Sequence, residues 1–210
     1  MPLQNRVTPE GEIVADPARG LFMGNRGILH DDRKRLGVSR WKHKCWIICR
    51  TSFRGRHRRV MTPNRYTELF FLDEAVAIAA GHRPCFECRR QDYYAWQAAW
   101  QAGNGGDSPP RAPAMDALLH GQRVERRTRR QRVWRSPIDA LPDGTFVTYK
   151  DAPCLLHEGW LWPWSHTRYG RALAIPAAAT ATVLTPPAAV GTLRGGYRPA
   201  LHDSLRNVTR

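Results

Sequence analysis

The sequence predicts an α+β fold in which an α/β unit precedes a small antiparallel β-rich unit. A strand-like apolar run at residues 45–53 is followed by helical patterns at 74–80 and 90–102. A segment rich in Gly, Ser and Pro then interrupts the periodicity, and the last third holds several short alternating runs bounded by turn residues. We expect four parts: an irregular N-terminal arm at 1–32, the α/β unit at 33–102, a flexible and arginine-rich connector at 103–136, and the β-rich unit at 137–210.

The composition favours a globular, strongly basic protein. Hydrophobic residues make up 42% of the 210 residues, and 33 Lys and Arg against 18 Asp and Glu leave a formal charge of +15. Such an imbalance favours a polyanionic partner such as nucleic acid, although solvated arginines on a basic protein are the alternative. Prolines interrupt the most apolar stretch, 173–190, so no membrane partner is expected. With no secretory signal at Met1 to Arg6, we expect a cytoplasmic protein whose five cysteines are free thiols or metal ligands.

The N-terminal arm is dense in Gly and Pro, which disfavours long regular elements. We expect one short strand there, at Glu12 to Ala15. The triplet His30-Asp31-Asp32 is more typical of a polar turn than of a metal site.

The basic strand region, Arg33 to Arg59, carries eleven Lys or Arg and no acidic residue. Residues 45–53 within it predict a buried strand. If that strand continued, Arg50, Arg54, Arg56 and Arg58 would share one face and could follow a row of phosphates. The alternative is a solvent-facing strand whose charges oppose edge pairing.

Cys49 lies within this cationic stretch. Nearby cations stabilise a thiolate, so we expect its pKa to be lowered and its sulfur to be ready for attack or for metal binding. The alternative is a small buried apolar residue.

The next elements are a helix and a C-x-x-C turn. Asp73 is a suitable N-cap and Gly81 a suitable stop for a helix at 74–80. Pro84 then favours an extended turn that brings Cys85 and Cys88 close enough to chelate one ion. A redox pair is the alternative, but redox pairs usually open a helix after a strand, whereas this pair follows a helix.

Together these residues carry a family resemblance. The runs Ile47-Ile48-Cys49-Arg50-Thr51-Ser52, Phe70-Phe71-Leu72-Asp73-Glu74-Ala75 and Ala80-Gly81-His82-Arg83-Pro84-Cys85-Phe86-Glu87-Cys88-Arg89 resemble the zinc-binding N-terminal domain of the Ada-type DNA methylphosphotriester repair proteins. In that family four cysteines bind zinc, and the first accepts a methyl group from a DNA phosphotriester. The resemblance spans 46–90 and implies that Cys49 is the methyl acceptor and that Cys85 and Cys88 are the last two ligands.

One position departs from the family pattern. The second family cysteine falls at Phe53, which cannot bind a metal, while a structural Zn²⁺ usually has four ligands. Cys45 is a candidate substitute, but four residues of straight strand span roughly 13 Å, so the backbone would have to turn between Cys45 and Cys49. His57 is a second candidate, and His43 or His82 a third. A relative that has lost its metal is the remaining alternative.

The second half offers less specific signals. The aromatic spacing at 90–102 predicts a helix, Met115 to His120 a helical turn or two, and 123–135 an arginine-rich segment that either contacts a polyanion or is solvated. We expect strands at 145–149, 154–156, 159–162 and 180–184, and a short helix at 187–193. The aromatic residues between 160 and 169 are either a base-stacking platform or core: Trp160, Trp162, Trp164, His166 and Tyr169.

The sequence thus favours a zinc-dependent nucleic-acid-binding protein, with DNA as the expected partner and damage response or repair as the expected process. One alternative is an enzyme, with Cys49 as the methyl acceptor or with an active site in the Trp-rich unit. Another is an RNA-binding or structural module. The arginines expected to contact nucleic acid are Arg50, Arg54, Arg56, Arg58, Arg83, Arg89 and Arg90.

Overall fold

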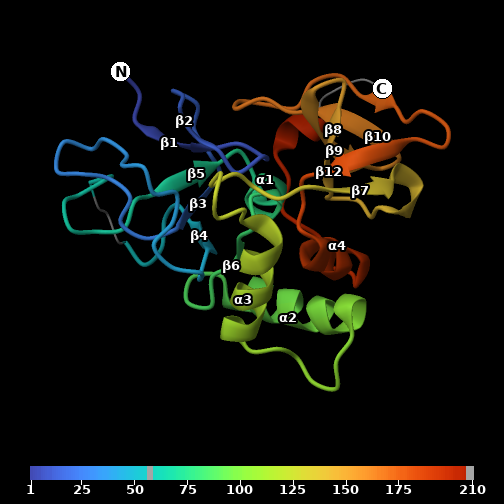
Figure 1. Cartoon of the computed structure of the whole chain (residues 1–210), viewed down its shortest axis with the longest axis horizontal. Coiled ribbons are helices and arrows are strands. Elements are labelled where there is room, and N and C mark those ends of the chain that lie inside the picture. The colour runs from blue at the N-terminus through green and yellow to red at the C-terminus, as the bar shows by residue number, and fades with distance from the viewer. Residues whose placement is uncertain (56–58, 207–210) are drawn as a thin grey trace.

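The computed structural model describes residues 1–55 and 59–206. It confirms the α+β class: a mixed six-stranded sheet with helices is followed by an antiparallel six-stranded sheet. In Figure 1 the two sheets lie side by side, and helices α2, α3 and α4 gather at one end of the molecule. None of the helices in this part of the chain has both the length and the apolar character needed to cross a bilayer.

The first sheet holds the strands of the N-terminal half. Its strand order is β2-β1-β5-β3-β4-β6, with parallel pairing between β1 and β5 and between β4 and β6. The strands are β1 (Gln4–Val7), β2 (Ile13–Ala15), β3 (Phe22–Asn25), β4 (Ile47–Arg50), β5 (Leu69–Phe71) and β6 (Arg83–Pro84). Helix α1 (Glu74–Ala79) begins at the predicted N-cap, where the Asp73 carboxylate accepts a hydrogen bond from the Val76 amide.

The N-terminal segment is more regular than expected. Residues 1–32 contribute β1 and β3 as well as the predicted strand β2, and all three belong to the first sheet. Long-range pairing orders these short strands, which the local pattern does not reveal. Gly24 has a packing role in β3, because a Cβ at this position would collide with the carbonyl oxygen of Ile47 on β4.

The second sheet is antiparallel throughout, as predicted, with the order β11-β10-β9-β8-β12-β7. Every expected strand of this region is present. The strands are β7 (Trp134–Pro137), β8 (Phe146–Tyr149), β9 (Ala152–His157), β10 (Trp160–Pro163), β11 (Leu173–Ala174) and β12 (Thr180–Val183). Two 3₁₀ turns also occur in this half of the chain: Ile138–Ala140 lies between β7 and β8, and Asp203–Leu205 comes after the last strand of the sheet.

Three helices complete the fold: α2 (Arg90–Asn104), α3 (Ala112–Arg123) and α4 (Pro187–Arg194). Helix α3 extends at both ends beyond the helical turn or two expected at 115–120. Part of the segment 103–136, which we expected to be a flexible connector, is therefore helical. Pro113 in its first turn suits a helix start, because the amide that proline lacks would have no partner there.

One hydrophobic core joins both halves of the chain. Phe71 and Trp96 of the first half lie in the same buried cluster as Phe146, Trp162 and Tyr169 of the second half. Trp162 and Tyr169 are therefore core residues, as one of the two interpretations of the aromatic run predicted. The Tyr169 hydroxyl also donates a hydrogen bond of 2.8 Å to the Asp73 carboxylate at the start of α1.

Candidate metal centre

Three cysteines from two distant segments meet at one edge of the first sheet. Cys49 lies on β4, Cys85 directly follows β6, and Cys88 lies in the turn that leads into α2. Their three Sγ atoms all lie within 4.8 Å of one another. Parallel pairing of β4 with β6 brings them together, and the Cys85 amide extends this pairing with a 2.9 Å hydrogen bond to the Ile48 carbonyl.

Backbone amides surround the sulfurs. The Arg50 amide donates to Sγ of Cys88 at 3.4 Å, and the amides of Glu87 and Cys88 donate toward Sγ of Cys85. The Arg89 amide closes the turn with a 3.1 Å hydrogen bond to the Cys85 carbonyl. Amide donors favour a thiolate over a thiol, so the turn is suited to hold sulfur in the form that binds a metal.

The spacing and chemistry of this cluster fit a metal ion. With Zn–S bonds of about 2.3 Å, tetrahedral geometry places two ligand sulfurs about 3.8 Å apart. The separations of up to 4.8 Å in the cluster need only small adjustments to reach this geometry. Cys85 and Cys88 are buried and Cys49 is half-buried. The triad can hold a soft or borderline metal such as zinc through three sulfurs, with one coordination position left to another ligand.

Without a metal, the three thiols differ in pKa. Hydrogen bonds from the Cys49 and Cys88 side chains lower the pKa of Cys85 well below its usual range. The pKa of Cys49 is raised, mainly because its side chain donates a hydrogen bond to Cys85 and secondly because it contacts Cys88. The expectation that the surrounding cations would lower the pKa of Cys49 is therefore wrong for the metal-free protein, because its two sulfur neighbours outweigh them.

The local context of the C-x-x-C pair also differs from the expectation. Strand β6 separates α1 from Cys85, and α2 begins two residues after Cys88. The pair therefore does lie between a strand and a helix, which removes the contextual argument against a redox role. What favours a metal is the third sulfur, because a redox pair needs only two cysteines.

The candidates for a fourth ligand lie apart from the triad or outside the described residues. Cys45 is exposed, its Sγ accepts a hydrogen bond from Arg83 at 3.6 Å, and it is not among the cysteines that cluster. His43 contacts Asn25 at 3.2 Å. The His82 ring is fully buried between Trp46 and Phe71. His57 belongs to residues 56–58, which are not described.

The arginines predicted to contact nucleic acid fall into two groups. Arg50, Arg54 and Arg90 are exposed. Arg83 and Arg89 are 3% and 4% exposed and form buried ion pairs with Asp116 and Glu74. Their side chains hold α3 and α1 in place, so they are not part of an accessible cationic surface.

The proposed row of arginines along one strand does not form. Strand β4 ends at Arg50, and positive φ angles of 52° at Arg54 and 65° at Gly55 turn the chain away. Arg56 and Arg58 lie outside the described residues. Only local geometry, and not a shared strand face, relates Arg50 to Arg54.

The structure also reveals contacts that the sequence did not predict. Asp116 binds Arg83 through two 2.8 Å hydrogen bonds across 33 positions of sequence. Arg26 and Arg123 lie over the ring of Trp46. No short-range spacing relates these residues, and only the neighbouring Trp and basic residues hinted at cation–π contacts.

Comparisons of the chain with protein-family models, curated proteins and solved structures give no match. The cysteine triad, which can bind a metal ion, is the feature of the structure that bears most directly on function.

Proposed function

We propose that this protein binds one zinc ion through Cys49, Cys85 and Cys88 and uses the metal-stabilised unit to bind nucleic acid, with DNA as the target, in damage response or repair. The observation that carries the proposal is the convergence of three sulfurs within 4.8 Å from segments 36 residues apart, 49 and 85. These are the three cysteines that the resemblance to Ada-type domains singles out.

Bound zinc would keep the three thiolates deprotonated at neutral pH and would tie β4 to the turn before α2. The chain itself contributes the amides of Arg50, Glu87 and Cys88, which point at the sulfurs. The buried Arg83–Asp116 pair fixes the residue two positions before Cys85. The ligands are thus held by a preformed backbone rather than by a mobile loop.

The test of zinc binding is elemental analysis of purified protein and of single cysteine variants. One zinc per chain is expected in wild type, with loss in Cys49→Ser and Cys85→Ser. Cys45→Ser and Cys154→Ser are the matched controls, because Cys45 is outside the triad and Cys154 is buried in the second sheet. Equal zinc content in all four variants would contradict the proposal.

The support for nucleic acid is the charge of +15 together with the exposed residues Arg50 and Arg90, which lie one residue after Cys49 and two residues after Cys88 in the sequence. Electrostatic binding predicts that log Kd rises with log salt by roughly 0.9 per phosphate neutralised on duplex DNA. Arg50→Gln and Arg90→Gln should each reduce this slope by about one, whereas Arg168→Gln, an exposed residue of the second unit, should leave it unchanged. A salt-independent affinity would refute this part.

A second function is favoured by the exposure of Cys49, which is half-buried while Cys85 and Cys88 are 7% and 9% exposed. Of the three cysteines, Cys49 is the residue with the largest exposed fraction. In a stoichiometric transfer, its thiolate would attack the methyl carbon of a DNA methylphosphotriester. The S–C bond forms as the C–O bond breaks, and the electron pair leaves with the phosphate oxygen as a phosphodiester. The protein would gain the mass of one CH₂ on Cys49 after incubation with methylated DNA, and a zinc-loaded protein without this gain would rule the reaction out.

A further inference from the structure

Two buried guanidinium groups lie against the ring of Trp46. Arg26 and Arg123 are 2% and 1% exposed. Their Cζ atoms lie 4.0 Å and 3.6 Å from the centre of the Trp46 ring. The two positive charges are thus held close to a single aromatic side chain in the interior.

These two arginines differ from the other buried arginines in their partners. Arg83 and Arg89 each face a carboxylate. Arg26 instead donates to the Gly11 carbonyl at 3.0 Å and contacts His82, and Arg123 donates to the carbonyls of Gly81 and Lys44. Within residues 1–55 and 59–206, no carboxylate forms an ion pair with either one. Nη2 of Arg26 and Nε of Arg123 are buried without any hydrogen-bond partner there.

The environment is therefore short of negative charge. Burial lowers the pKa of Arg26 to about 9 and, together with Arg26, lowers the pKa of Arg123. Burial and both arginines likewise hold the pKa of His82 well below its ordinary value, so the ring adds no charge of its own. Glu12 and Asp116 offset only part of the effect of burial on Arg26 and Arg123, so an anion placed beside the two guanidinium groups would lower the remaining cost of burying them.

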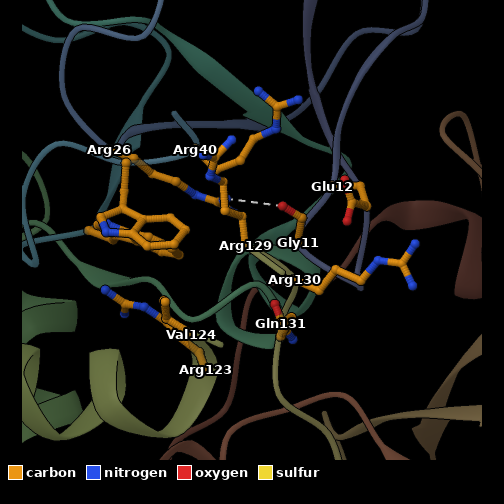
Figure 2. Close-up of a pocket in the computed structure, with 11 residues that line it drawn as sticks. Gly11, Glu12, Arg26, Arg40, Arg123, Val124, Arg129, Arg130 and Gln131 are labelled. Carbon is orange, nitrogen blue, oxygen red and sulfur yellow. Dashed lines mark hydrogen bonds between the residues drawn. The ribbon is translucent and has the colours of Figure 1, made fainter. Parts of the chain in front are cut away.

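A pocket opens at these arginines. A cavity of about 20 Å³ is lined by Arg26, Arg123 and Trp46, and also by residues of the segment that follows α3. In the view of Figure 2 the Arg26 side chain lies above that of Arg123, and Glu12 and Arg130, which also line the cavity, lie farther to the right. The inner cavity has room for a group about the size of one water molecule.

A larger hollow of about 580 Å³ shares Glu12, Arg40, Arg129 and Arg130 with this cavity. That volume is within the range of small-molecule sites. Gln131 anchors its wall, because the side-chain amide donates to the carbonyls of Ala79 and Leu184 at 2.7 Å and 2.6 Å. A small cavity lined by two buried guanidinium groups thus adjoins an outer space of small-molecule size.

We propose that this pocket binds the terminal phosphate of a nucleotide or of a nucleic-acid strand end, with one phosphoryl oxygen in the inner cavity. A phosphate monoester carries a charge of about −1.5 to −2 at neutral pH, which matches the two unpaired guanidiniums better than the single charge of a phosphodiester. Guanidinium groups are also well suited to phosphate oxygens. The Glu12 carboxylate on the wall can accept hydrogen bonds from the base or sugar that is joined to the phosphate.

This pocket goes beyond the proposed zinc site and does not depend on the cysteines. If it binds strand ends, it also gives the proposed nucleic-acid binding a specific target. The arginine-rich segment 123–135 then has a defined part in recognition, since Arg123, Arg129 and Arg130 line the pocket whereas Arg126 and Arg127 do not.

The test compares two pairs of probes: thymidine 5′-monophosphate against thymidine, and a short oligonucleotide with a 5′-phosphate end against the same oligonucleotide with a 5′-hydroxyl end. Wild-type protein should bind the nucleotide at least about tenfold more tightly than the nucleoside in calorimetry. If strand ends are the ligand, the 5′-phosphorylated oligonucleotide should show the same advantage in fluorescence anisotropy. If free nucleotides are the ligand, the two oligonucleotides should bind with equal affinity, and thymidine 5′-monophosphate should still bind more tightly than thymidine.

Single-residue variants distinguish phosphate binding in the pocket from nonspecific attraction by the positive charge of the protein. Arg130→Gln and Arg40→Gln, at exposed and half-buried rim positions, should reduce the phosphate advantage severalfold without disturbing the core. Arg127→Gln removes one exposed charge of the same segment outside the pocket and should leave the advantage unchanged. Arg26→Lys keeps the charge but loses the planar fork, and should weaken nucleotide binding if the variant melts as the wild type does.

Two results would overturn the pocket. One is equal affinity for nucleotide and nucleoside, and for the two oligonucleotide ends, in wild type. The other is an equal loss of the phosphate advantage in Arg127→Gln and Arg130→Gln. Nucleic-acid binding itself is judged on the 5′-hydroxyl oligonucleotide, so either proposal can fail while the other stands.

Discussion

The backbone amide of Arg50 donates a hydrogen bond of 3.4 Å to Sγ of Cys88. This contact joins the strand that carries Cys49 to the turn that carries Cys85 and Cys88. Because it involves backbone and sulfur only, it does not depend on the identity of the Arg50 side chain. The cysteine cluster therefore belongs to the architecture of the sheet edge, and the exposed Arg50 side chain is available for another role.

The five cysteines should differ in reactivity when zinc is bound. Cys45 is exposed and should react first with maleimide, although burial of its sulfur and the nearby Asp116 raise its pKa. Cys154 should react last, because burial raises its pKa to about 11. The triad should be protected until a chelator removes the metal. Labelling followed by peptide mass spectrometry measures this order, and equal labelling of the triad with and without chelator would count against a bound metal.

The buried pair of Arg83 and Asp116 should be a main support of the metal centre. Asp116→Asn leaves the Arg83 charge uncompensated at 3% exposure, and we expect a loss of about 3–5 kcal/mol in the free energy of unfolding. Zinc affinity should fall as well, because Arg83 precedes Cys85 by two residues. The measurement is denaturant unfolding with a parallel zinc titration.

The matched control for this variant is Asp203→Asn. Asp203 contacts Arg206 at 3.9 Å with both side chains at least 80% exposed. Exposed pairs of this kind contribute little, so no measurable change is expected. Similar losses in the two variants would mean that the Arg83–Asp116 pair has no special role.

Asp73 should make the stability depend on pH. Burial raises the pKa of its carboxyl group to about 6, against opposing hydrogen bonds from Val76, Tyr169 and His202. A carboxyl group whose pKa is higher in the folded state stabilises that state fully below the unfolded pKa, near 4, and loses this contribution as the pH rises through 6. The share of stability at stake is about 3 kcal/mol.

Asp73→Asn tests this expectation, because asparagine still caps a helix but does not titrate. The advantage of wild type over the variant, measured by denaturant unfolding, should be larger at pH 4 than at pH 7. Taking the difference between the two proteins removes the pH dependence that the thiols share. A difference that stays constant over this range would show that Asp73 does not change its protonation there.

The sequence predicts the elements whose signals are local. Asp73 and Gly81 define the ends of the segment that contains α1, and Gly81 has the positive φ of 81° that favours glycine after a helix. The aromatic spacing predicts α2, and the alternating runs predict the second sheet. The sequence also points to the cysteines that meet at the sheet edge, because a C-x-x-C turn and a cysteine in a basic strand are unusual patterns.

What the sequence did not predict depends on contacts between distant residues. Strands β1 and β3 have only four residues each, and their pairing with β5 gives them order. Arg83 and Arg89 look like surface arginines until Asp116 and Glu74 are placed beside them. The same holds for Arg26 and Arg123, whose burial against Trp46 follows from the packing of three segments.

The most direct test of the central claim is X-ray absorption spectroscopy at the zinc edge of the purified, zinc-loaded protein. The account predicts three sulfur neighbours at about 2.3 Å and one nitrogen or oxygen neighbour. Cys85→Ser should lose a sulfur or lose the zinc, and Cys45→Ser should give the wild-type spectrum. A protein that takes up no zinc, or a zinc site with fewer than three sulfurs, would contradict the claim that Cys49, Cys85 and Cys88 form a metal centre.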